Sequence, residues 1–155
     1  LGLEIDGFLE NNKENDNFGM GIIGHLKAPI TSEDFLNQIS MITKSVLRYS
    51  EGNKNQIYKV GIVAGSGKEF LSRAIENNLD AFITSDISYH YFHSTDSKLW
   101  LIDPGHYETE QFIVPALTEF LEKNLLNKNI NFFQSKINTN PVKYYTQSKK
   151  LKYEI

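Results

Sequence analysis

The chain has 155 residues, 40% hydrophobic and 12% aromatic, which is enough to build the core of one domain. Its formal net charge of -3 and sequence pI near 5.8 argue against nucleic acid or an anionic membrane as a partner. The absence of cysteine excludes disulfides and thiolate sites, and this composition fits a reducing cytoplasm best. No apolar run approaches the roughly 20 residues of a membrane span, and no signal peptide is visible. We expect the chain to be the back part of a longer polypeptide.

The first half of the chain predicts a loop, a strand, a helix and a second strand. Residues 10–19 are polar and rich in turn formers, and the glycine-laced apolar run Gly19–Leu26 is typical of a strand. Thr31 or Ser32 is the expected cap of a helix. That helix carries apolar residues at helical spacing: Phe35, Leu36, Ile39, Ile42, Val46 and Leu47. The β-branched run Ile57–Ala64 predicts a buried parallel strand.

The second half continues the alternation of helices and strands. After the turn "GSGK" and a helix, strands are predicted at Asp80–Asp86 and Leu99–Asp103, with a short helix at Ile87–His93 between them. A long helix is predicted from about His106, and a last strand at Ile130–Ile137. The pattern indicates an α/β fold that is layered, with mostly parallel sheets and flanking helices.

The segment "AGSGKEF" stands where backbone N–H groups can hold phosphate, between a strand and a helix. It does not match a P-loop, because Ile62 occupies the position of the first glycine and Glu69 follows the lysine. It does not match the dinucleotide fingerprint, because Phe70 replaces the third glycine. A tight turn is therefore favoured over an anion site.

The segment "SDISYHYFH" places Asp86 at the end of a strand and His90 four residues later. Sites in α/β sheets are built at strand ends, so this pair could reach one ion or one water. Equally, Asp86 could cap the following helix and His90 could pack among aromatic residues. For His93, packing is the favoured interpretation.

The segment "DPGHYETE" is the strongest signal in the sequence. Pro104 and Gly105 end the strand, so His106 lies in the first helical turn with Glu110 on the same face. Imidazole and carboxylate one turn apart form a two-ligand unit for Zn²⁺, Mn²⁺ or Fe²⁺. Acidic residues such as Glu108 and Glu110 are also ordinary at helix starts, but that explanation does not account for a histidine, whose neutral form the helix dipole favours.

Two strand ends are expected to converge on this segment. Asp86 and Asp103 both end apolar strands, and parallel neighbours bring their C-terminal ends together. We therefore expect Asp86, His90 and Asp103 to line a pocket next to His106.

The stretch from "GSGKEF" to "DPGHYETE" resembles the GTP cyclohydrolase I type 2 homologue family, also called the NIF-three-like proteins. That family carries a glycine-serine-glycine turn, then "DAxxTxDxxYH", then "DxGHxxTE". The upstream "GMGIIGHL" also matches its glycine-rich segment, with His25 where an acidic residue is more usual, and "SKINTNPVKYY" resembles the terminal segment of bacterial members.

The resemblance implies an intertwined two-lobe α/β subunit with a centre of two divalent metal ions, assembled as a toroidal homohexamer. Residues 1–93 would form most of one lobe, and residues 94–155 would complete the other, whose N-terminal half is absent from this chain. His106 and Glu110 fall on family metal ligands, with Glu110 as the expected bridge. Two adjacent histidines and an aspartate would come from the N-terminal portion.

The function that this resemblance implies is a metal-dependent hydrolase acting on a nucleotide such as GTP. Water activated by two cations would attack an electrophilic carbon, as in opening a purine imidazole ring. Glu108 or His90 would transfer protons. The alternative is a non-catalytic, ring-shaped scaffold or regulatory protein in which the metal centre is structural.

Overall fold

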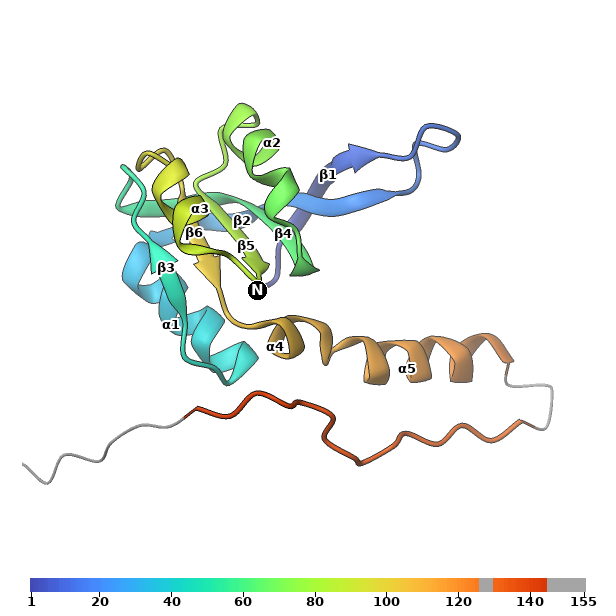
Figure 1. The fold of residues 1–155 in the computed structure, drawn as a ribbon. Coiled ribbons are helices and arrows are strands. Elements are labelled where there is room, and N and C mark those ends of the chain that lie inside the picture. Colours follow the sequence, from blue (N-terminus) through green and yellow to red (C-terminus); the bar gives the residue numbers. More distant parts are fainter. Residues whose placement is uncertain (126–129, 145–155) are drawn as a thin grey trace, which may run out of the picture. The chain divides into compact units, whose positions relative to one another are not determined.

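The computed structural model describes residues 1–125 and 130–144, and the chain divides into two compact units (Figure 1). The first unit is Leu1–Val114 and the second is Pro115–Ile155. The strands are β1 (Glu4–Asn11), β2 (Gly19–Thr31), β3 (Arg48–Ser50), β4 (Gln56–Ser66), β5 (Ala81–Ser85) and β6 (Trp100–Asp103). The helices are α1 (Ser32–Thr43), the 3₁₀ turn η1 (Lys68–Phe70), α2 (Leu71–Glu76), α3 (Tyr89–Ser94), α4 (His106–Glu110) and α5 (Ile113–Leu125).

The strands form one six-stranded sheet in the order β1-β2-β4-β5-β6-β3, which confirms the predicted α/β class. The expected parallel pairing holds only for β4, β5 and β6, whereas β1, β2 and β3 join the sheet antiparallel. The connections explain the antiparallel pairing of β1 with β2 and the parallel pairing of β4, β5 and β6. A short loop joins β1 to β2, and a short loop can only turn the chain back antiparallel, whereas parallel strands need a long crossover. The crossovers are η1 with α2 between β4 and β5, and α3 between β5 and β6.

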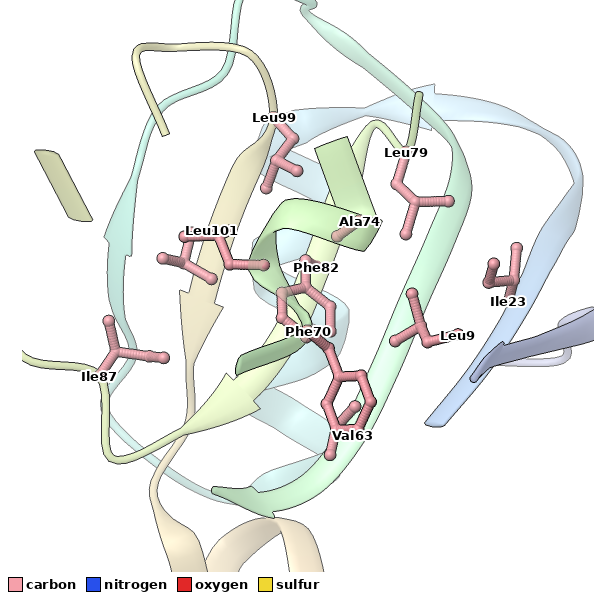
Figure 2. Close-up of a cluster of buried hydrophobic side chains, with 11 residues drawn as sticks. Leu9, Ile23, Val63, Phe70, Ala74, Leu79, Phe82, Ile87, Leu99 and Leu101 are labelled. Atoms are coloured by element: carbon pink, nitrogen blue, oxygen red, sulfur yellow. The ribbon is translucent and has the colours of Figure 1, made fainter. Parts of the chain in front are cut away.

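The central strands are buried on both faces, and alternate residues enter two different cores. On β5, Phe82 packs into the cluster under α2, while Ala81 and Ile83 face the cluster under α1. Figure 2 shows the first cluster, in which Phe70 and Ala74 lie over Phe82. Each large apolar side chain buried in these clusters contributes about 1.5–3 kcal/mol. The two cores hold the ends of β4, β5 and β6 in place.

The predicted long helix from His106 is interrupted. α4 ends at Glu110, a turn follows, and α5 begins at Ile113. Pro115 explains the break, because it has no N–H for the carbonyl of Gln111 and its ring would clash with that group. The short helix α4 therefore belongs to the first unit and is placed by that unit alone.

The predicted strand at Ile130–Ile137 is not formed. Residues 130–144 contain no helix or strand. A strand needs a neighbour to pair its backbone, and the side chain of Phe133 is 90% exposed. None of the helices in the described ranges is long and apolar enough to span a membrane. The proposed division of a two-lobe subunit at residue 93 stays a prediction.

Candidate metal centre

The candidate site lies at the C-terminal ends of the three parallel strands. Gly65 is near the end of β4, Asp86 follows β5, and Asp103 ends β6, directly before the turn into α4. Neighbouring parallel strands present these ends at the same edge of a sheet, so residues distant in sequence meet there. His106, at the start of α4, is placed over this edge.

His106 lies between two carboxylates. Its Nδ1 is 2.6 Å from Oδ2 of Asp86, and its Nε2 is 3.2 Å from Oε1 of Glu110. All three side chains are about half exposed. The predicted approach of Asp86 to His106 is thus present in the structure, and so is the one-turn pairing of His106 with Glu110.

The hydrogen bond to Asp86 raises the pKa of His106 above its usual 6.5. Partial burial opposes this effect, and the negative charges of Glu110 and Asp86 add to it. The helix start was expected to favour neutral imidazole, but α4 is short and two nearby carboxylates outweigh it. The carboxylates therefore stabilise the protonated ring, and a proton competes with a cation for the imidazole nitrogen.

Asp86 does not cap α3, whose N-cap is Ser88. Its backbone is left-handed, with φ 58°, and this conformation turns its carboxylate toward His106. Both backbone polar groups of the next residue, Ile87, are hydrogen-bonded. The N–H of Ile87 donates to Oδ2 of Asp103 at 3.1 Å, and Nη2 of Arg48 donates to the carbonyl of Ile87 at 3.1 Å.

Asp103 is 3% exposed, and its carboxylate holds the backbone of the site in place. Its Oδ2 forms an ion pair with Arg48, and its Oδ1 accepts the N–H of Gly105 at 2.9 Å. The Asp103 carboxylate is buried whereas the Arg48 side chain is more than half exposed, so removing Arg48 would leave a buried carboxylate without its charged partner. Asp103 therefore positions the loop that carries Asp86 and the turn that leads into His106.

A second network ties α4 to the ends of β4 and β5. The N–H of Gly65 donates to Oγ1 of Thr109 at 2.9 Å, and Thr109 in turn donates to the carbonyl of His106 at 2.9 Å. The hydroxyl of Ser85 donates to the carbonyl of Gly105 at 2.9 Å. These bonds fix the first turn of α4, and with it the face that carries His106 and Glu110.

Neither of the two residues assigned to proton transfer belongs to the helix face that carries His106 and Glu110. Glu108 is 8% exposed, because it is two residues from both His106 and Glu110 and points off their face by about 160°. His90 is exposed on α3 and its ring contacts that of Tyr89, with centroids 5.8 Å apart. Their catalytic roles stay predictions.

The sequence interpretation missed Arg48, Thr109 and the role of Gly65 beside Glu110. Arg48 is 55 residues from Asp103, in a three-residue strand without an apolar pattern. Thr109 belongs to the segment "DPGHYETE", but its contact with Gly65 depends on the meeting of strand ends that are far apart in the sequence.

The family model of Duf34/NIF3 (NGG1p interacting factor 3) matches residues 1–141 of this chain. The chain belongs to this family. The resemblance seen in the sequence motifs is therefore confirmed, and the Duf34/NIF3 fold accounts for the six-stranded sheet.

The chain spans less than half the length of the curated relatives that it matches. The GTP cyclohydrolase 1 type 2 homolog of Staphylococcus epidermidis is 35% identical over 143 residues, covering 88% of this chain and 38% of the relative. The homolog of Haemophilus influenzae is 33% identical over 112 residues, covering 71% of this chain and 45% of the relative. The crystal structure of Staphylococcus aureus protein SA1388 aligns with a TM-score of 0.75 at 28% identity, covering 82% of this chain and 42% of that one.

The donor atoms fit a divalent cation in part. Two donors on one Zn²⁺, each at about 2.0–2.1 Å, lie about 2.8–3.4 Å apart. Nε2 of His106 and Oε1 of Glu110 are 3.2 Å apart, within this range. Asp86 meets the other ring nitrogen, as carboxylates do behind metal-binding histidines. In the part of the chain that the structure describes, no group of three or more His, Cys, Asp or Glu residues is arranged to hold an ion.

Proposed function

We propose that this chain binds a divalent metal ion, such as Zn²⁺, Mn²⁺ or Fe²⁺, through His106 and Glu110. The observation that carries the proposal is the 3.2 Å separation of Nε2 and Oε1, with the Asp86 carboxylate on Nδ1. The second ion of the implied two-metal centre would need further donors, with Glu110 as the bridge.

We further propose that the complete centre serves a hydrolase that acts on a nucleotide such as GTP. The support is the name of the curated relatives, GTP cyclohydrolase 1 type 2 homolog, and the chain spans less than half of their length. A divalent ion supplies Lewis-acid chemistry, lowering the pKa of water and polarising a substrate oxygen. The chain's own residues would hold the ion and orient its ligands. Asp86 orients the imidazole of His106, and Thr109 fixes the helical turn that carries both donors. A toroidal homohexamer in the cytoplasm is part of the same proposal.

One observation favours the alternative of a scaffold or regulatory protein. A cavity of about 440 Å³ reaches Thr109, next to the candidate centre, but its wall is mostly apolar. Side chains such as Ile39, Ile62 and Phe112 line it. A site for a polar nucleotide needs several placed polar groups in addition to apolar walls. An apolar wall beside a metal centre suits packing against another protein segment better.

Two measurements test these proposals. The first is a Zn²⁺ titration of the metal-stripped chain, followed through the ¹⁵N imidazole resonances of His106. The second is GTP consumption by a protein that contains the complete two-ion centre, with Zn²⁺, Mn²⁺ or Fe²⁺ and with a chelator. Metal-dependent turnover that Glu110→Gln abolishes supports the hydrolase. A Zn²⁺-induced shift at His106 without turnover supports the scaffold, and no shift at His106 overturns metal binding altogether.

A further inference from the structure

Two carboxylates compete for one imidazole ring at the candidate centre, and they are not equally close. Asp86 Oδ2 is 2.6 Å from Nδ1, whereas Glu110 Oε1 is 3.2 Å from Nε2. We propose that Asp86 is a positioning residue that keeps the imidazole proton on Nδ1, so that Nε2 of His106 presents its lone pair to a divalent cation. This inference rests on the proposed metal binding and adds a residue that acts through His106.

The protons of the ring decide which nitrogen can bind a metal. Neutral imidazole carries one N–H, so one nitrogen donates and the other has a free lone pair. With the proton on Nδ1, the N–H donates to Asp86, and Nε2 and Glu110 together offer two donor atoms to a cation. With the proton on Nε2, the N–H would donate to Glu110, and Nε2 could not bind a metal. The shorter contact to Asp86 favours the first arrangement.

The loop that carries Asp86 is held in a conformation that serves this contact. The left-handed φ of 58° at Asp86 is uncommon for a residue other than glycine, and it costs free energy that surrounding contacts must offset. Asp103 binds the N–H of Ile87, and Arg48 binds the carbonyl of Ile87. The peptide groups on both sides of Ile87 are thereby fixed, and with them the direction of the Asp86 side chain.

The chain contains a matched control for this geometry. On the β1–β2 hairpin, Nδ1 of His25 is 2.9 Å from Oδ1 of Asp6, and Nε2 is 3.4 Å from Oε2 of Glu4. The same chemical groups thus surround a second histidine at a different place in the sheet. Removing the carboxylate of Asp6 should change the His25 ring without changing His106.

The test compares Asp86→Gly, Asp86→Asn and the control Asp6→Gly in the full chain. Glycine adopts a positive φ readily, so Asp86→Gly removes the carboxylate while the backbone conformation is kept. Asparagine also tolerates this conformation and keeps an acceptor oxygen. The first readout is the tautomer of His106, from imidazole ¹⁵N resonances without metal, at a pH where the ring is neutral. The second is the affinity for Zn²⁺ from the same resonances.

We expect the Nδ1–H tautomer in the wild type and a shift toward Nε2–H in Asp86→Gly, with Zn²⁺ bound about 10–100-fold more weakly. Asp86→Asn should restore the tautomer at least in part, and Asp6→Gly should leave both readouts at His106 unchanged. An unaltered tautomer in Asp86→Gly, or an altered tautomer with unchanged Zn²⁺ affinity, overturns the inference. So does an Asp86→Asn variant that behaves like Asp86→Gly in both readouts. If Zn²⁺ does not change the imidazole resonances of His106 in the wild type, the proposed metal binding fails. The tautomer is measured without metal, so it tests the effect of Asp86 on the ring separately.

Discussion

Gly65 and Glu110 lie so close that a Cβ atom on the glycine would be 2.4 Å from Oε1 of the glutamate. The same added atom would be 3.3 Å from Cε1 of His106. The backbone of Gly65 is left-handed, with φ +66°. The absence of a side chain here therefore serves both the turn after β4 and the space that the two donor side chains occupy.

Replacing Gly65 with Ala should weaken the candidate centre as well as the fold. The left-handed conformation should cost about 1–2 kcal/mol of unfolding free energy, measured by urea denaturation. The new methyl group should also push the Glu110 carboxylate away from His106 and weaken Zn²⁺ binding. Gly2→Ala is the control, because Gly2 has the same φ of +66° with no atom within 4 Å of an added Cβ. Unchanged Zn²⁺ affinity in Gly65→Ala would show that Glu110 can move without loss.

The chain by itself should bind divalent metal weakly. His106 and Glu110 supply two donors, whereas a catalytic zinc usually has three protein ligands. Calorimetric titration of metal-stripped protein with Zn²⁺ or Mn²⁺ should show no tight, stoichiometric uptake. A well-occupied two-ion site in this chain would contradict the expectation that further donors are required.

The parts of the fold that the sequence predicted are those with a strong local pattern. β5 and β6 are short apolar runs, and α1 shows apolar residues at helical spacing with Thr31 as its cap. β3 was missed because two of its three residues are exposed, so it has no pattern of burial. The break before α5 was missed because the apolar spacing continues through it, and only Pro115 indicates the interruption.

The candidate site follows the same division between local and long-range information. The pairing of His106 with Glu110 is a property of one helical turn and could be predicted from spacing. The contact of Asp86 with His106 followed from the parallel arrangement of strands. The ion pair of Arg48 with Asp103 joins an edge strand to its neighbour, and no residue near Arg48 in the sequence indicates that partner.

The stability of the β1–β2 hairpin should depend on the protonation of His25. Its hydrogen bond to Asp6 raises the pKa above the usual 6.5, burial opposes this, and the charges of Asp6 and Glu4 add to it. The ring of Tyr58 also lies next to His25, and the ammonium of Lys59, the residue paired with His25 on β4, donates to the carbonyl of Asn77. Because the folded-state pKa is raised, the stabilising contribution is complete below the unfolded-state pKa and is lost as pH rises through the folded-state value.

The measurement compares the wild type with His25→Gln by urea denaturation over a pH series. The advantage of the wild type should be largest below pH 6.5 and should shrink as the pH rises above it. Asp6→Asn should reduce this dependence, because it removes the principal partner. An advantage that grows with pH would contradict the assigned direction of the shift.

The last prediction separates the two glutamates of α4. Glu110→Gln keeps nearly the same volume but removes the charge next to Nε2 of His106, so Zn²⁺ binding should weaken at least about tenfold. Glu108→Gln is the matched control, because Glu108 is buried on the opposite face of the same helical turn and should leave Zn²⁺ affinity unchanged. Urea denaturation of both variants checks that each is folded under the conditions of the titration. In a protein with a complete two-ion centre, Glu110→Gln should also release at least one ion, since the charge that offsets repulsion between two dications is lost. Equal loss of affinity in both variants, or none in Glu110→Gln, would mean that the acidic residues of α4 are ordinary for a helix start and that His106 does not bind metal with Glu110.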